Sequence, residues 1–159
     1  MTKPASSQPG TALRWEWRSF DNLDVPTLYA LLQLRAAVFV VEQACAFQDL
    51  DDLDQPAWHC LGWDGDVLAA SQRCLPPGTP YAESSIGRIV TAPSHRGRDL
   101  GRELVARAIA FNHERWPAHP IRIGAQARLS HFYEGYGFVR VGDVYMEDGI
   151  EHVHMLLNP

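Results

Sequence analysis

The segment His-Arg-Gly-Arg-Asp-Leu-Gly-Arg-Glu-Leu at 95–104 carries residues that could bind an anion. Gly97 and Gly101 let the backbone approach a ligand closely, because they have no Cβ. A predicted helix follows, and the unpaired N–H groups at its start would point toward the same ligand. Positive charge comes from three arginines, Arg96, Arg98 and Arg102. The pattern indicates a loop that could hold a phosphate, although an ordinary strand-to-helix turn can carry the same glycines.

Asp99 stands in the middle of this loop, where a carboxylate would repel a phosphate. Aspartate is also a preferred N-cap residue, so we expect its side chain to turn outward and cap the following helix. The sequence contains neither the Gly-Lys-Ser/Thr of a Walker loop nor a GxGxxG dinucleotide fingerprint. Their absence argues against hydrolysis of ATP or GTP by this loop, and against dinucleotide binding on a doubly wound sheet.

Length, charge and cysteine content narrow the classes of function. The polar residues 1–12 are expected to be a disordered lead-in, and 13–159 suffice for one domain with a sizeable core. The net charge of −5 argues against broad nucleic-acid binding. No apolar run in the sequence is expected to reach the roughly eighteen residues of a membrane span. Three widely spaced cysteines, Cys45, Cys60 and Cys74, indicate reduced thiols in a cytoplasmic protein.

Apolar periodicity and turn residues predict the elements that would position the loop. Asp24 before Val25-Pro26 predicts a helix start, and Asp64-Gly65 and Asp148-Gly149 are typical hairpin turns. In chain order we expect a strand at 13–20, a helix from 25, a hairpin at 58–75, a strand at 85–92, a helix at 101–116, a strand at 121–127, a short helix at 129–137 and a hairpin at 138–157. This order indicates an α+β domain whose mixed, mostly antiparallel sheet carries packed helices.

Two motifs give the loop a family context. The segment 89–101, Ile-Val-Thr-x-Pro-x-x-Arg-Gly-x-x-x-Gly, resembles motif A of the GNAT superfamily of N-acetyltransferases. The segment 132–138, Phe-Tyr-x-x-x-Gly-Phe, resembles its motif B. Segments 34–54, 125–138 and 145–155 resemble the ElaA-like branch in particular. The resemblance implies a GNAT acyl-CoA N-acyltransferase fold, with helices on both faces of a sheet that splays apart between the strands at 85–92 and 121–127.

The resemblance also implies acetyl-CoA as cosubstrate and no metal. Backbone groups of Ile89, Val90 and Thr91 would pair with the pantetheine arm, and a bulge near 88–90 would point an N–H at the thioester carbonyl. The pyrophosphate would lie against the amides of Arg96, Gly97, Arg98, Asp99, Leu100, Gly101 and Arg102. Phe132 would be a further cofactor contact, and Gln126 stands where many members carry an asparagine near the thiol. Asp99 departs from the family, because it occupies the middle glycine position of the loop.

Acid and base roles follow from the same resemblance. Tyr133 would be the acid that protonates the departing CoA thiolate, although on spacing alone it could simply pack in a helix face. Two residues are open as the base that deprotonates the amine. Glu42 could lie at a helix end facing the cleft, where burial would raise its pKa. His152 is the alternative, because histidine titrates near neutral pH.

Charges in the first half of the chain suggest substrate contacts. Arg35 recurs on the apolar face of the first predicted helix, so it would either bind the substrate or hold the following acidic loop by an ion pair. Gln43 is a second candidate substrate contact. The loop contains Asp49, Asp51, Asp52 and Asp54, which would be solvated or, near a cleft, would attract a cationic amine. His152, His154 and His59 lack the carboxylate or cysteine spacing of a metal site.

The sequence therefore predicts an N-acetyltransferase in which a primary amine of a small molecule or protein attacks acetyl-CoA directly. The alternative is a non-catalytic acyl-CoA-binding or sensor module that keeps the loop without turnover. We expect no nucleic-acid or membrane partner, and a homodimer is compatible with the resemblance.

Overall fold

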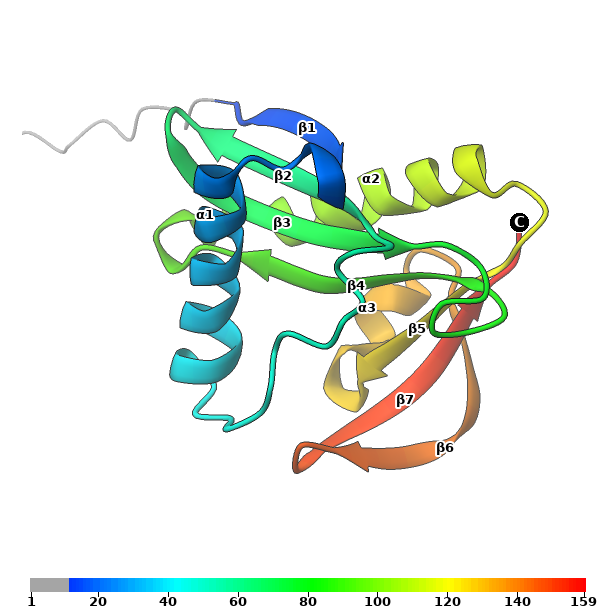
Figure 1. Ribbon diagram of the computed structural model, residues 1–159. Helices are drawn as coiled ribbons and strands as arrows, with labels where there is room; N and C mark the ends of the chain where they lie inside the picture. The colour runs from blue at the N-terminus through cyan, green and yellow to red at the C-terminus, as the bar shows by residue number, and fades with distance from the viewer. Residues whose placement is uncertain (1–11) are drawn as a thin grey trace, which may run out of the picture.

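The computed structural model describes residues 12–159, so residues 1–11 of the predicted lead-in lie outside the described part (Figure 1). Seven strands form one sheet in the order β1-β2-β3-β4-β5-β7-β6. The strands are β1 (Arg14–Ser19), β2 (Trp58–Asp64), β3 (Val67–Leu75), β4 (Ser84–Thr91), β5 (Ile121–Gln126), β6 (Val139–Glu147) and β7 (Ile150–Leu157). The helices are α1 (Val25–Arg35), α2 (Leu100–Arg115) and α3 (Ser130–Glu134). The predicted order of strands and helices is confirmed.

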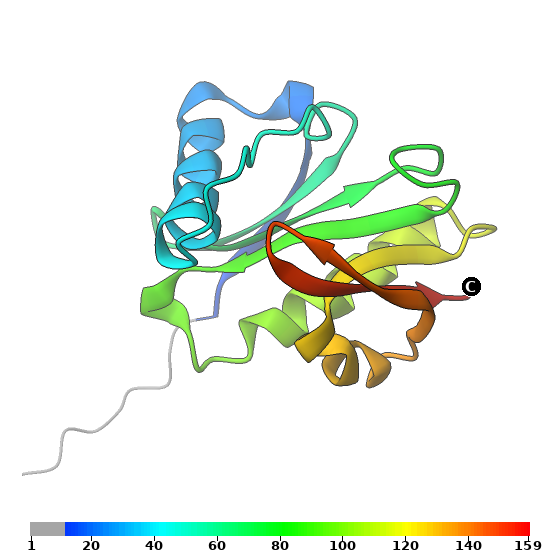
Figure 2. The same ribbon diagram turned by 90° about the horizontal axis from the view of Figure 1, so that it is seen from below.

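Helices cover both faces of the sheet, as Figure 2 shows, with α1 on one side and α2 and α3 on the other. All neighbouring strands are antiparallel except β4 and β5, which are parallel. Below α1 the core contains Leu31, Leu34 and Val38 against Leu61 and Val90. On the other face a larger cluster includes Ala108 of α2 together with residues of β4, β5 and β7. The two cores hold β4 from opposite sides, through Val90 in the first and Ile86 in the second, and the predicted α+β fold with a mixed sheet is confirmed.

The start of α1 follows the sequence pattern. The Thr27 amide donates to Asp24 Oδ1 at 2.7 Å, so Asp24 is the predicted N-cap, and Pro26 occupies the first turn. After Arg35 the helix continues with π-helical hydrogen bonding through Ala36–Glu42. A π-helical segment widens the backbone locally and is frequent at functional sites.

The continuous helix Val25–Glu42 is eighteen residues long and apolar enough to span a membrane by length and composition. The sequence-based expectation that no run reaches this length was therefore wrong. The finding is weak evidence for a span, because the core helix of a folded domain passes the same test. Here the helix packs on the sheet through Leu31 and Leu34, and it carries the buried, ion-paired Arg35.

Candidate active site

Strands β4 and β5 separate soon after they begin. They pair at only two positions, Ser84 with Ile121 and Ser85 with Arg122. Beyond these pairs no strand of residues 12–159 bonds to the β5-facing side of β4, and Figure 1 shows the two strands diverging. The predicted opening between the strands is confirmed. An open strand edge can pair with the amide groups of an extended ligand as an added strand would.

A bulge distorts β4 inside this opening. The register between β3 and β4 shifts between Ser71 and Arg73, and Arg88 has φ +48°. A non-glycine residue in the left-handed region is strained and occurs most often where function requires it. The Arg88 guanidinium holds this geometry: Nε lies 2.8 Å from Asp49 Oδ1, and Nη2 donates to the Asp49 carbonyl oxygen at 2.9 Å. The bulge predicted near 88–90 is present, and an acidic loop fixes it from outside the sheet.

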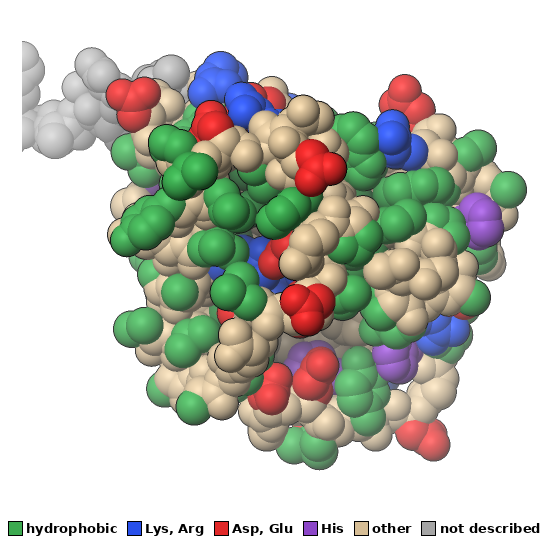
Figure 3. All heavy atoms as spheres, in the orientation of Figure 1, with side chains coloured by type: hydrophobic (Ala, Val, Ile, Leu, Met, Phe, Trp, Pro, Cys, Tyr) green, Lys and Arg blue, Asp and Glu red, His purple; other side chains and the backbone are tan. Residues whose placement is uncertain are grey.

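A cavity of about 490 Å³ occupies the opening. Its walls come from β4, β5, α3, the loop that follows α1 and the tip of the β6–β7 hairpin. The lining includes Ile86, Gly87, Arg88 and Ile89 of β4, Ile123, Gly124, Ala125 and Gln126 of β5, Tyr133, Gln43, Cys45, Phe47, Gln48, Asp51, Glu147, Asp148, Ile150 and His152. Figure 3 shows acidic side chains beside a histidine near the hairpin tip. The cavity thus has an apolar inner part between the strands and a polar mouth.

Tyr133 projects from α3 into this cavity. Its ring packs at 5.1 Å from that of Phe132 and 5.9 Å from that of Phe138, measured between centroids. Burial raises the pKa of the Tyr133 hydroxyl to about 12, with a smaller contribution from Tyr136. The hydroxyl therefore stays protonated at neutral pH and can donate a hydrogen bond into the cavity. The ring packs in the helix face, as spacing alone predicts, and Tyr133 also lines the cavity, so its role as the acid stays a prediction.

The glycine-arginine loop leads from β4 into α2. Gly97 has φ +79°, and a Cβ added at Gly97 or Gly101 would meet nothing within 4 Å. The backbone is thus open to a ligand at both glycines, next to the N-terminus of the sixteen-residue α2. Arg96 Nη2 lies 2.7 Å from Glu42 Oε1, so this arginine is tied to the end of the π-helical segment.

Comparisons with known proteins place this geometry in a family. Residues 78–158 match the family described as an acetyltransferase (GNAT) domain. Protein ElaA of Escherichia coli is 42% identical over 145 residues, covering 90% of this chain and 95% of that protein. The chain belongs to the GNAT superfamily, in the branch of ElaA.

Two crystal structures support the same assignment. An acyl-CoA N-acyltransferase from Pseudomonas aeruginosa superposes with a TM-score of 0.88 at 40% identity, covering 91% of this chain and 99% of that chain. Escherichia coli ElaA superposes with a TM-score of 0.84 at 40% identity, covering 91% and 98%. The fold is therefore the GNAT acyl-CoA N-acyltransferase fold.

Asp99, which departs from the GNAT loop pattern, does not cap α2 as expected. It occupies the N-cap position, but its backbone is left-handed, with φ +56°, and its side chain accepts no capping hydrogen bond. The carboxylate is 89% exposed and lies 3.9 Å from the Arg102 Nε. It turns outward as predicted, and its backbone adopts a positive φ that glycine accommodates more readily than aspartate. The family glycine at this position has a direct conformational reason.

We expect Asp99→Gly to stabilise the fold by up to about 1 kcal/mol, because it relieves a left-handed aspartate and removes no cap. Acetyl-CoA should bind about two- to fivefold more tightly, because a screened negative charge beside the phosphate is lost. Asp99→Asn is the matched control, since it removes the charge but keeps a side chain. Chemical denaturation and calorimetric titration measure both effects. Weaker binding of acetyl-CoA by both variants would contradict this placement of the loop.

The two candidate bases occupy different surroundings. Glu42 is 42% exposed, pairs with Arg96 and is absent from the cavity lining, so the burial in the acceptor cleft that the sequence left open for it is not observed. His152 lines the cavity together with Tyr133. Gln43, beside Glu42 in sequence, also lines the cavity, as does Gln126, whose Oε1 accepts from Arg128 Nε at 2.9 Å.

Arg35 does not reach the cavity. Its side chain is 1% exposed, with Nε 2.9 Å from Asp49 Oδ2 and Nη1 2.7 Å from Asp54 Oδ1. The candidate substrate contact is therefore ruled out by burial, and the ion-pair alternative is the one the structure adopts.

The acidic loop is likewise not a free solvated segment, because Asp49 and Asp54 are buried. Burial opposes ionisation of Asp51, but its hydrogen bond with Arg73 and the charges of Arg73 and Arg88 outweigh that effect and lower its pKa to about 2. Asp51 lines the cavity with its charge already matched by arginines, so it is a support of the site rather than a free anion.

Sequence reasoning missed the hairpin tip. Glu147, Asp148 and Ile150 line the cavity, and Cys45 Sγ lies 3.8 Å from the Asp148 carbonyl oxygen, so the tip meets the loop after α1. The Asp148-Gly149 turn was predicted, but its position over the opening depends on the pairing of β7 with β5. Within residues 12–159 no group of three or more His, Cys, Asp or Glu is placed to hold a metal ion.

Proposed function

We propose that this GNAT domain transfers the acetyl group of acetyl-CoA to a primary amine of a small molecule or protein. The observation that carries the proposal is the opening between β4 and β5, whose cavity is lined by Tyr133 with its hydroxyl protonated at neutral pH. Transfer to an amine requires an electrophile held in place, a donor for the leaving group and access for a nucleophile.

The residues present fit acetyl-CoA. Gly97 and Gly101 leave space at the backbone beside the N-terminus of α2, where a pyrophosphate is favoured by unpaired amides and the helix dipole. The unbonded side of β4 from Ile86 to Thr91 offers amide groups to a pantetheine arm. The bound molecule would supply an acetyl thioester, which is open to direct attack by an amine.

Different groups of the chain would then perform the separate steps of the transfer. The bulge at Arg88 re-aims backbone N–H groups of β4 into the opening, where they can stabilise negative charge on a carbonyl oxygen. Tyr133 donates its proton toward the departing sulfur. The polar mouth between the loop at 43–51 and the hairpin tip is the entry for the amine, because the loop at 43–51 follows α1 on one face of the sheet, whereas the phosphate loop leads into α2 on the other face (Figure 2).

Calorimetric titration with acetyl-CoA, followed by a free-thiol release assay across a panel of amines, tests the proposal. We expect binding in the micromolar to millimolar range and amine-dependent release of CoA. Propionyl-CoA and longer acyl-CoA thioesters in the same assay would measure the preference for the acetyl group. An absence of binding at millimolar acetyl-CoA would contradict the proposal, and binding without thiol release from any amine would favour the non-catalytic binding module.

A further inference from the structure

The β6–β7 hairpin fixes the tautomer of the neutral His152 ring at the mouth of the cavity. His152 Nδ1 lies 2.8 Å from the Ile150 carbonyl oxygen. A carbonyl oxygen only accepts hydrogen bonds, so Nδ1 must carry the proton. In the neutral ring Nε2 therefore holds the free lone pair, and it is this nitrogen that can take a proton from a substrate.

Glu147 stands next to that nitrogen. Its Oε2 lies 3.5 Å from His152 Nε2, and the His152 side chain is only 12% exposed, whereas that of Glu147 is 58% exposed. The two residues come from opposite strands of the hairpin, where Tyr145 pairs with His152 and Glu147 pairs with Ile150. A carboxylate beside an imidazole stabilises the imidazolium, so Glu147 favours the protonated product of a transfer to Nε2.

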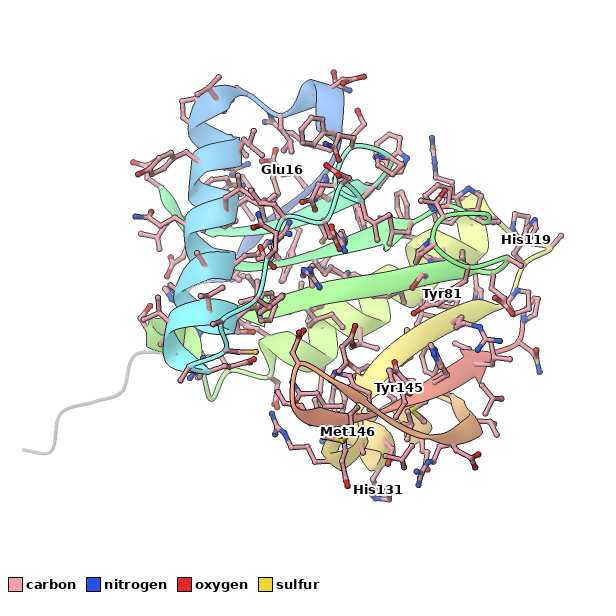
Figure 4. The ribbon with its side chains drawn as sticks, turned by 60° about the horizontal axis from the view of Figure 1, so that its bottom comes forward. Glu16, Tyr81, His119, His131, Tyr145 and Met146 are labelled. Atoms are coloured by element: carbon pink, nitrogen blue, oxygen red, sulfur yellow. The ribbon has the colours of Figure 1, made fainter. Side chains whose placement is uncertain are left out.

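The other groups around His152 do not replace Glu147 as the neighbour of its Nε2. The Tyr145 ring lies 5.7 Å from that of His152 and 4.8 Å from that of His154. Tyr145 and Met146 are neighbours on β6 (Figure 4), and the strand alternation leaves Met146 exposed. Burial, followed by the charge of Glu147, raises the pKa of Tyr145 to about 12, so it stays neutral. The remaining polar groups that line the cavity with His152 are Gln126 of β5, Tyr133 of α3, Arg88 of β4, Asp148 of the turn, and Gln43, Cys45, Gln48 and Asp51 between α1 and β2.

We propose that His152 is the proton acceptor for the incoming ammonium, and that Glu147 is a positioning residue that stabilises the His152 imidazolium. The inference rests on the proposed function. One ammonium N–H bond breaks and its proton passes to Nε2, which frees the nitrogen lone pair to form the C–N bond. As the C–S bond breaks, the sulfur receives the Tyr133 proton, and a second proton leaves the nitrogen to restore Tyr133. His152 finally releases its proton to solvent.

The rival residue Glu42 lacks the geometry for this role. It pairs with Arg96 at 2.7 Å and does not line the cavity that Tyr133 and His152 both line. A carboxylate held by a guanidinium is a weaker base than a free one, because its charged form is stabilised. Glu42 instead links the π-helical segment to the phosphate loop.

The test is the pH dependence of kcat/KM. His152→Gln should lower kcat/KM about 10²–10⁴-fold near neutral pH. Its residual rate should keep rising as the amine loses its proton in solution. Glu147→Gln should move the acid limb of the profile to lower pH and lower its plateau, because the imidazolium formed by proton transfer to Nε2 loses its neighbouring carboxylate. Glu151→Gln, an exposed neighbour on β7, is the matched charge control and should leave the limb in place.

NMR chemical shifts of the His152 ring nitrogens in wild type and Glu147→Gln give a readout independent of turnover, and Nδ1 is expected to carry the proton of the neutral ring in both. Wild-type affinity for acetyl-CoA in each variant would show that the site is folded. An active wild type whose His152→Gln variant keeps the same rate and acid limb would overturn this role alone. A wild type that releases no thiol would overturn the proposed function and this role with it.

Discussion

Replacing Tyr133 by phenylalanine should lower kcat by about 10²–10⁴-fold and change the affinity for acetyl-CoA by less than about twofold. The substitution keeps the ring that packs on Phe132 and Phe138, and it removes only the hydroxyl of this cavity-lining residue. The loss should therefore appear in the step that expels the CoA thiolate, since binding uses the loop and β4. Tyr29→Phe removes a hydroxyl from a residue that is 70% exposed on α1, and it is the control for the substitution itself.

The raised pKa of Tyr133 determines where its deprotonation would lower the rate on the alkaline side of the pH–rate profile. An acid must be protonated to act, and burial moves the loss of its proton to about pH 12. Buried surroundings also disfavour the charged CoA thiolate, which raises the pKa of the CoA thiol. The proton donor Tyr133 and the proton acceptor CoA are therefore shifted in the same direction. Tyr133 should therefore produce no alkaline limb between pH 7 and 10. An alkaline limb in that range that disappears in Tyr133→Phe, or an unchanged kcat, would remove Tyr133 as the acid.

Local sequence patterns were sufficient to predict most elements of the fold. The Asp24 cap of α1 and the two Asp-Gly hairpin turns need only neighbouring residues, and all three appear where the sequence places them. The opening between β4 and β5 was implied by the family motifs rather than by periodicity. Strand alternation specifies that β4 and β5 are strands, but it does not specify where their pairing stops.

Charge pairing between distant segments could not be predicted in the same way. Glu42 meets Arg96 across 54 positions of sequence (96 − 42), and the aspartates of the acidic loop meet arginines of α1, β3 and β4. A spacing rule within one element gives no information on such partners. The available signal was the coincidence of four aspartates in one loop with Arg35 on the apolar face of the first predicted helix. That coincidence indicates compensation of charge, because a buried guanidinium requires a partner.

The backbone at Asp99 shows a different limit. An aspartate before a helix favours a capping prediction, because its side chain usually accepts from the first turn. The left-handed backbone of Asp99 instead follows the path of the loop between Gly97 and α2. In this chain the tertiary path determines the conformation, and local preference does not.

Asp54→Asn should destabilise the fold by about 3–5 kcal/mol, because it breaks a buried network of charges. Asp54 Oδ1 accepts from Arg35 Nη1 at 2.7 Å and from Arg73 Nη1 at 2.9 Å. The substitution removes the negative charge between two buried guanidinium groups, which then repel each other. Asp52→Asn is the matched control in the same loop, since Asp52 is exposed, and it should change stability by less than about 0.5 kcal/mol.

Urea denaturation at neutral pH measures both variants, and equal stabilities would show that the network contributes little. Acid should reproduce the loss in the wild type. The pKa of Asp51 falls from 3.8 to about 2 on folding, so its ionisation stabilises the fold above the unfolded pKa and is lost as pH falls toward 2. The same loop holds Arg88 and lines the cavity, so acetyl-CoA binding should weaken over this acid range before the whole chain unfolds. Loss of binding only together with global unfolding would mean that the acidic loop and the sheet form a single cooperative unit.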